Sequence, residues 1–318
     1  METNNSLVRI IGPGQVEAPA AKIRFLFLPG RGIFARRAGR FRCLSDGNPL
    51  GDYFSFLALL SDAQQTTFDQ FPPVPLSGPE EQALCHYQGM PLLGWQTWRR
   101  DPAWRWGLEM VLQQMKEANL PKSANETITG LLQAGETALE EKADRILAGD
   151  MADISARELP FIAAALQVYW VHMASSLDAG AFAHLQQGGL CPVCGSHPNA
   201  GIVGAAGERQ GLRYLSCSLC SSQWHMVRLK CSDCGATEGI SFYTLEGSNG
   251  AVKAESCNGC DSYLKLLYLG KDHQMDAMAD DLATLALDML MDEQGKARKG
   301  ANLFFHPGDR ADSKNLPA

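Results

Sequence analysis

The chain has 318 residues, of which 45% are hydrophobic and 20% are charged, so it can form one large domain or several smaller ones and is not broadly disordered. Its formal net charge is −7, which argues against a general binder of polyanions. Residues 1–22 lack the basic start and long apolar run of a signal peptide, and the Arg36-Arg37 pair is followed by polar sequence unlike a twin-arginine signal, so we expect a cytoplasmic protein.

The first part of the chain is expected to be helical. We predict a flexible arm over residues 1–24 and a helical domain over 25–187. Residues 28–46 begin with turn residues and then become helical, with a short basic face formed by Arg36, Arg37, Arg40 and Arg42. We interpret this face as solvated, with a contact to a partner through Arg36 and Arg37 as the alternative.

Apolar residues at helical spacing predict the remaining helices of this domain. The predicted ranges are 51–71, 102–118, 123–147 and 155–185. Ser123 with Glu126, and Ser155 with Glu158, have the spacing of a capping box and mark two helix starts. Four prolines in residues 71–81 predict an extended connector.

Residues 85–106 are rich in aromatic side chains. They contain Tyr87, Trp95, Trp98, Trp104 and Trp106. We expect these rings to pack between helices, and a peptide-binding groove is the alternative interpretation.

Four Cys-x-x-Cys pairs follow, and they dominate the sequence. They are Cys191 with Cys194, Cys217 with Cys220, Cys231 with Cys234, and Cys257 with Cys260. A gap of 22 residues separates the first pair from the second and also the third from the fourth, so the second half repeats the first at an offset of 40 residues. We therefore predict two tandem four-cysteine modules of the zinc-ribbon or rubredoxin type, over 188–228 and 229–270.

The repeat indicates which pairs share a metal ion. Gly195 and Gly235 follow the second cysteine of their pairs, where a tight turn needs a residue that tolerates positive φ. The equal gaps favour pair one with two and pair three with four, and a cross-braced arrangement is the alternative. Four thiolates suit zinc and also suit a single iron ion, so the cysteines leave the metal open.

Other residues near the cysteines have minor expected roles. His197 and His225 can replace a sulfur ligand, but eight cysteines already fill two sites, so we expect them outside the coordination shells. Trp224 is expected to cover the first site. Sites closed by four protein ligands are structural or electron-transferring, because catalytic zinc keeps one position open.

The charge of the cysteine-rich region argues against binding of nucleic acid. Residues 191–260 contain five basic and five acidic side chains, and two divalent ions with eight thiolates add 4 − 8 = −4. A surface that binds phosphates is strongly basic instead. Eight of the ten cysteines at metal spacing also favour a reducing compartment over a secreted disulfide framework.

The final part, 271–318, is predicted as an amphipathic helix over 274–295 and a tail. Asp280 and Asp281 are adjacent on this helix and diverge by about 100°, so they do not form an acid-base pair, and we expect a polar face or a partner contact. The sequence lacks the common nucleotide-binding and hydrolase motifs, so we expect no enzymatic activity and no small-molecule substrate. The expected fold class is α+β: a mainly helical N-terminal domain, two four-cysteine modules and a C-terminal helix.

The ordered motifs resemble one known family. CPVCGSHP, LRYLSCSLCSSQWHMVRLKCSDCG, AESCNGCDSYLKLLYLGKDH and ADDLATLALDMLMDEQG, with ARRAGRFRCL near the N-terminus, resemble the FdhE family of formate dehydrogenase accessory proteins. The resemblance covers residues from about 25 to 305.

This resemblance implies a role in the production of respiratory formate dehydrogenase, through contact with its catalytic subunit in the cytoplasm before export. It also implies rubredoxin-type iron in the two four-cysteine sites, with zinc as the alternative. A one-electron redox protein and a nucleic-acid-binding ribbon protein are the rival hypotheses, the latter disfavoured by charge.

Overall fold

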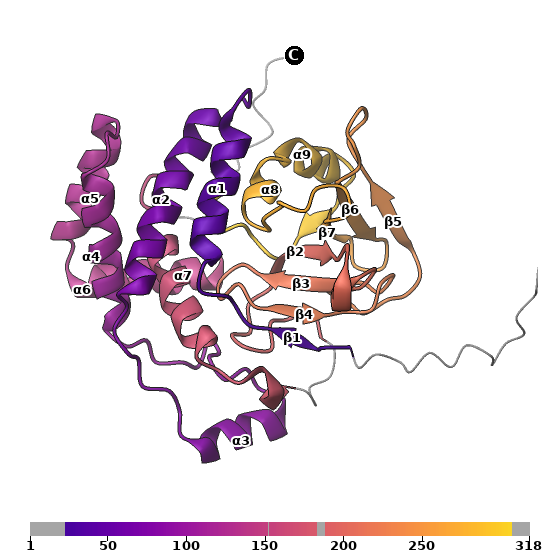
Figure 1. The fold of residues 1–318 in the computed structure, drawn as a ribbon, viewed down its shortest axis with the longest axis horizontal. Coiled ribbons are helices and arrows are strands. Elements are labelled where there is room, and N and C mark those ends of the chain that lie inside the picture. The colour runs from indigo at the N-terminus through magenta and orange to yellow at the C-terminus, as the bar shows by residue number, and fades with distance from the viewer. Residues whose placement is uncertain (1–22, 152, 183–187, 307–318) are drawn as a thin grey trace, which may run out of the picture.

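Helices form the first half of the computed structural model, which describes residues 23–151, 153–182 and 188–306. Their bounds are α1 Ile33–Ser45, α2 Gly51–Asp69, α3 Pro79–Gln88, α4 Ala103–Lys116, α5 Lys122–Gln133, α6 Glu136–Ala148 and α7 Leu159–Ser175. In Figure 1 these helices lie on one side of the molecule and the sheet lies on the other, with α3 set apart below. No helix of the described chain is long and apolar enough to cross a bilayer.

Helix α7 lies at the centre of the helical part. It is apolar all round, and nearly all of its side chains are buried, as expected for a helix surrounded by others. Helices α2, α4 and α6 pack against it. The helix predicted over 155–185 is shorter in the structure, because the chain forms a separate turn from Ser155 to Glu158, where the Glu158 N–H donates to the Ser155 carbonyl.

The single helix predicted over 123–147 is wrong: the structure has α5 and α6 in its place. Ala134 and Gly135 are extended, with ψ of 139° and 154°. Helix α5 packs against α4, whereas α6 packs against α7. One straight helix over 123–147 cannot make both contacts, so the chain bends between α5 and α6. The predicted cap at Ser123 is also wrong, because α5 begins at Lys122, one residue earlier.

The aromatic segment contributes to the main core, as predicted. Trp104 is fully buried, and Trp95, Trp98 and Trp106 pack against the core. The Trp98 indole N–H donates to the Tyr169 hydroxyl at 2.8 Å. Tyr87 differs from these residues, because 90% of its surface is exposed.

One mixed sheet carries both cysteine-rich repeats. Its strands are β1 Leu26–Phe27, β2 Pro198–Val203, β3 Arg213–Cys217, β4 Gln223–His225, β5 Ile240–Tyr243, β6 Val252–Cys257, β7 Ser262–Tyr268 and β8 Ala297–Arg298. Their order is β1-β4-β3-β2-β7-β6-β5, and β8 pairs with β7. The two repeats join where β2 pairs in parallel with β7, so the sheet crosses the boundary that the sequence predicts at residue 229.

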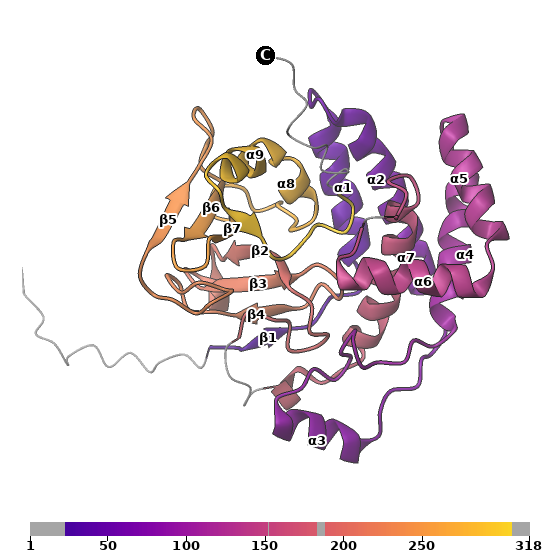
Figure 2. The same cartoon turned by 180° about the vertical axis from the view of Figure 1, so that it is seen from behind.

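The predicted α+β fold class is confirmed, with one change at the C-terminal end. The helix predicted over 274–295 is two helices, α8 Ala279–Leu282 and α9 Leu285–Glu293. The buried Lys265 ammonium donates to the carbonyl oxygens of Asp281 and Thr284, at 2.8 and 3.0 Å. The same two oxygens also accept the N–H groups of Thr284 and Leu287, so Lys265 adds a further donor at the point where the chain passes from α8 to α9. Figure 2, which views the molecule from behind, shows both helices lying against the sheet.

Candidate metal centres

The first candidate metal centre contains Cys191, Cys194, Cys217 and Cys220. The Cys191 and Cys194 sulfurs come from the turn before β2, and the other two come from the end of β3 and the turn that follows. The Cys191–Cys220 and Cys194–Cys217 sulfur pairs are 3.5 and 3.3 Å apart. Four sulfurs around one zinc ion, each at about 2.3 Å, are about 3.8 Å apart, so this group has the size of a tetrahedral site.

The second candidate centre contains Cys231, Cys234, Cys257 and Cys260. The Cys231–Cys260 and Cys234–Cys257 sulfur pairs are 3.6 and 3.7 Å apart. All four ligand atoms of each group lie within 4.8 Å of one another. The sulfurs group as the equal sequence gaps predict, pair one with two and pair three with four, and not in the cross-braced arrangement.

Tight turns bring the cysteines of each pair together. Gly195 and Gly235 have φ of 74° and 77°, as predicted, and their N–H groups donate to the carbonyls of Cys191 and Cys231. The second turn of each centre has Ser221 or Asp261 in the same left-handed conformation. The sequence gives no signal for these two, because neither residue is glycine.

The two centres differ in burial. The four cysteines of the first centre belong to the main core together with Trp224, and none is more than 2% exposed. The segment before α4 holds this centre, because the N–H groups of Leu93 and Trp95 donate to the carbonyls of Val193 and Cys194 at 2.8 and 3.0 Å. In the second centre Cys234 is exposed and Cys260 is half-buried. A cysteine ligand is therefore exposed to solvent at the second centre, whereas the four cysteines of the first centre are buried.

Burial also controls the charge of the first group. It raises the pKa of the Cys191 and Cys217 thiols well above the ordinary value, and neighbouring thiols add to the effect. Burial opposes ionisation of Cys194 too, but hydrogen bonds from the other cysteines outweigh it and hold the pKa of Cys194 well below its usual range. Burial therefore opposes ionisation of Cys191, Cys194 and Cys217, and a divalent cation held by the sulfurs would offset this cost.

The second group ionises more readily at one position. Burial opposes ionisation of the Cys231 thiol, but the backbone N–H groups of Cys234 and Asp233 lower its pKa to about 7. Burial raises the pKa of Cys260 to about 12. The sulfur-only donor sets fit zinc and single iron alike, so the residues present are compatible with either metal.

Neither His197 nor His225 joins these groups among the described residues. His225 is buried on β4, with its ring 5.6 Å from that of Tyr214. Trp224 is fully buried, and its indole N–H donates to the Gly188 carbonyl at 2.9 Å. It lines the same cavity as Cys191 and Cys194, next to the first centre.

Three of the four residues predicted to contact a partner are inside the molecule. Arg37 donates to Gln167 at 3.0 Å and to Asp276 at 3.3 Å. Asp280 pairs with Arg40, and Asp281 pairs with Lys265 and Arg298, at 3.2 and 2.8 Å. These charges join α1 and β7 to the C-terminal segment, so we no longer assign the three residues to a surface contact. Arg36 is exposed, and its partner contact stays a prediction.

The buried charges that these residues face were not predicted from the sequence. Lys265 is fully buried in the apolar strand β7, and Arg213 forms a buried ion pair with Glu255 between β3 and β6. Lys265 could have been noticed in the sequence as a single lysine inside an apolar strand. A buried lysine needs a carboxylate partner, so its position indicates a buried ion pair.

Comparisons with known proteins match almost the whole described chain. Family models described as "FdhE, N-terminal", "FdhE, central domain" and "FdhE, C-terminal domain" match residues 23–187, 190–228 and 229–305. "Protein FdhE homolog" of Edwardsiella ictaluri is 44% identical, over 89% of this chain and 92% of its own. The homologue in Pseudomonas aeruginosa is 39% identical, over 94% and 98% of the two chains.

A solved structure has the same fold. The crystal structure of the FdhE protein from Pseudomonas aeruginosa superposes with a TM-score of 0.82 and 38% sequence identity. The match covers 90% of this chain and 100% of that one. The similarity therefore extends over the helical part and both cysteine-rich repeats.

Proposed function

Because the chain belongs to the FdhE family, we propose that it is an accessory factor in the maturation of respiratory formate dehydrogenase. It binds the catalytic subunit of that enzyme in the cytoplasm, before the subunit is exported. The single observation that carries this proposal is that all three parts of the family pattern occur in order. The eight cysteines assembled into two closed groups agree with it.

The proposed role is non-enzymatic. Each metal ion has four sulfur ligands available and so lacks the open position that hydrolysis requires. A metal ion held by the four cysteines of the first centre would supply folding free energy, because these residues come from two turns inside the main core. The protein then offers a rigid surface to the client subunit.

The second candidate function is one-electron transfer by thiolate-bound iron. One observation favours it: Cys234 of the second centre is exposed, so a redox partner can approach that sulfur closely. A colourless zinc-loaded protein that still supports maturation would exclude this role.

Affinity purification tests the accessory role. The tagged protein is recovered from anaerobically grown cells that express formate dehydrogenase, and the co-purifying proteins are identified by mass spectrometry. Enrichment of the catalytic subunit is expected, and exposed Met289→Ala serves as a surface control that retains it. Absence of an expressed catalytic subunit from the wild-type sample would contradict the proposal.

A further inference from the structure

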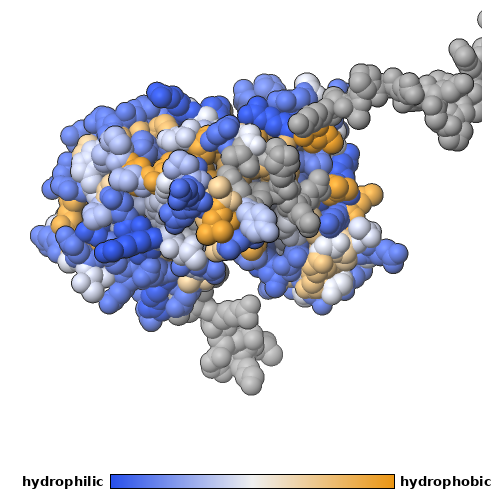
Figure 3. All heavy atoms as spheres, turned by 90° about the horizontal axis from the view of Figure 1, so that it is seen from below, coloured by the Kyte–Doolittle hydropathy of each residue, from blue (hydrophilic) through white to orange (hydrophobic). Residues whose placement is uncertain are grey.

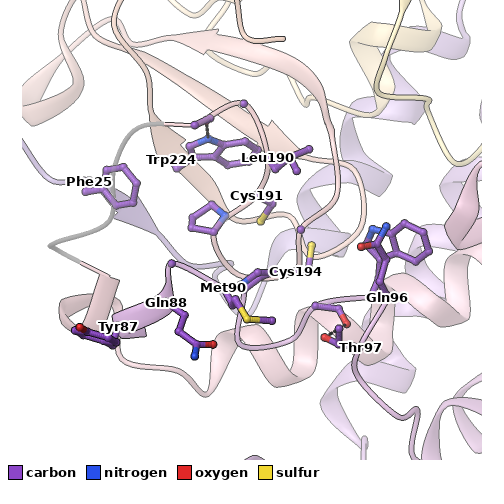
Figure 4. Close-up of a pocket in the computed structure, with 18 residues that line it drawn as sticks. Phe25, Tyr87, Gln88, Met90, Gln96, Thr97, Leu190, Cys191, Cys194 and Trp224 are labelled. Carbon is purple, nitrogen blue, oxygen red and sulfur yellow. Dashed lines mark hydrogen bonds between the residues drawn. The ribbon is translucent and has the colours of Figure 1, made fainter. Parts of the chain in front are cut away.

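A cavity of about 800 Å³ opens beside the first metal centre. It is surrounded by residues 87–97 at and after the end of α3, by the turn at 188–195, by Phe25 just before β1, and by Trp224 of β4. Figure 4 shows Phe25 and Trp224 on one side, Tyr87 and Gln88 on the other, and the two cysteines between them. Its volume lies within the range of roughly 300–1,000 Å³ that ligand sites have.

Among the residues that the structure describes, the lining carries no Asp, Glu, Lys or Arg side chain, although such residues make up 20% of the chain. Aromatic rings, glycine backbone and the polar side chains of Gln88, Gln96 and Thr97 form it instead. Arg and Lys side chains are the usual partners of a phosphate-bearing cofactor or nucleotide, and the described lining offers neither. A metal-loaded first centre contributes 2 − 4 = −2 charges, so an acidic ligand is disfavoured as well.

Large apolar side chains are exposed at the rim. Tyr87 is 90%, Leu190 is 50% and Met90 is 41% exposed, and Leu84 on α3 adds a further exposed side chain at 53%. Figure 3 views the molecule from below, the side on which α3 lies, and apolar side chains are exposed at several places on that face. Clustered exposed apolar residues beside a cavity are typical of an interaction site.

We propose that this cavity binds an extended, uncharged, apolar segment of the formate dehydrogenase catalytic subunit. The inference rests on the proposed function for the identity of the partner. The aromatic rings take apolar side chains of the segment, and the amide side chains and exposed glycine backbone bind its peptide groups. The expected segment is uncharged because the described lining has no ionic side chain and lies next to a metal centre that carries negative charge.

Two glycines allow a matched test. No described atom lies within 4 Å of a Cβ added at Gly188 in the cavity lining or at Gly130 on α5, and neither glycine has positive φ. Gly188→Glu therefore adds a charge at the lining at a position that accepts a Cβ, and Gly130→Glu adds the same charge on a distant helix. Tyr87→Ala removes an exposed ring from the opposite side of the cavity, with Tyr243→Ala on β5 as its control.

The probes are overlapping 15-residue peptides that cover a formate dehydrogenase catalytic subunit, and binding to the metal-loaded full chain is measured by fluorescence anisotropy. We expect the bound peptides to have an uncharged apolar centre. Gly188→Glu should weaken their binding by about tenfold or more, Tyr87→Ala should weaken it less, and both controls should bind as the wild type does. Absence of binding, preference for charged peptides, or unchanged binding by Gly188→Glu would overturn the proposal.

The intact catalytic subunit separates the two hypotheses. If it binds the wild type and the bound peptides compete with it, both the proposed function and the cavity assignment are supported. If peptides bind in the cavity but the intact subunit does not bind the protein at all, the proposed function fails and the peptide site remains. Equal binding of the subunit by wild type and Gly188→Glu, or loss of self-association in that variant by sedimentation, would assign the cavity to a different occupant.

Discussion

Asp281 joins three parts of the chain through buried contacts. Its carboxylate pairs with Lys265 of β7 and Arg298 of β8 and accepts a hydrogen bond from Asn302 at 2.9 Å. Asp281 and Lys265 are each at most 1% exposed. Removal of one member of such a group leaves the remaining charges without full compensation, which typically costs about 3–5 kcal/mol.

The first prediction concerns the pH dependence of this group. Burial opposes ionisation of Asp281, but Arg298 and Lys265 hold its pKa below the usual range. The unfolded chain therefore takes up this proton at a higher pH than the folded chain does, so the stabilisation is present above about pH 4 and is lost as pH falls further.

Asp281→Asn should lower the free energy of unfolding by about 3 kcal/mol at pH 7 and should flatten its decrease below pH 4. Urea unfolding from pH 3 to pH 7 measures both effects. Asp292→Asn, on the exposed side of α9, is the control and should follow the wild type. Equal curves for the two variants would show that the buried group contributes no net stability.

The second prediction concerns two adjacent glycines. A Cβ on Gly189 would lie 1.7 Å from the Ser232 carbonyl oxygen, whereas a Cβ on Gly188 would meet no atom within 4 Å. Gly189→Ala should therefore lower stability by about 1–3 kcal/mol, because the turn before the first centre must move away from the second repeat.

Thermal unfolding of both alanine variants checks this prediction. Gly188→Ala should have a midpoint close to that of the wild type. A midpoint for Gly189→Ala as high as that of Gly188→Ala would mean that the contact between the repeats is loose.

Some of the important residues could be predicted from the sequence and others could not. The eight cysteines and the glycines at 195 and 235 were identifiable because their spacing is tied to one chemistry. Asp280 and Asp281 were misassigned because a helical pattern does not show what packs against its polar positions. The partner of Asp280 on α1 is 240 residues away in the chain, and the partners of Asp281 come from β7 and β8, on either side of the helical segment.

At the element scale, the two four-cysteine modules share a local pattern but differ in surroundings. Helices and the segment 91–98 cover the first, whereas the second lies near the open edge strand β5. The repeat predicts their similarity, and the difference in burial depends on which module meets the helical part. Helix breaks at 134–135 and 283–284 were missed for a similar reason, since tertiary contacts on both sides decide them.

The third prediction follows from this difference in burial. A chelator should release the metal of the second centre first, because Cys234 is exposed, and the metal of the buried first centre later. The absorbance of the metal-chelator complex measures the release. We expect it to rise in two kinetic phases of equal amplitude.

Cysteine variants assign the two phases. Cys231→Ser with Cys234→Ser should lower the metal content from two ions per chain to one and remove the fast phase. Cys191→Ser with Cys194→Ser should also remove one ion and, in addition, lower the unfolding temperature, because these residues belong to the main core. A fast phase that persists without Cys231 and Cys234 would contradict the assignment.

At the scale of the whole molecule, the sheet and the buried charges make the cysteine-rich repeats one unit with the helical part. Strand β1 precedes the helices in the chain yet pairs with β4 of the first repeat, and α1 pairs with the C-terminal segment through Arg37 and Arg40. The sequence predicted the order of helical part, two repeats and C-terminal segment. It did not predict these long-range connections, because strands of two or three residues carry little periodic signal.

The proposed role in formate dehydrogenase maturation is tested most directly by the formate dehydrogenase activity of cells from which the gene for this chain has been deleted. We expect the respiratory enzyme to be synthesised but inactive in these cells, and we expect the wild-type chain and Gly130→Glu to restore its activity. Full formate dehydrogenase activity in the deletion strain, with no other protein of the same family present, would contradict the proposed function.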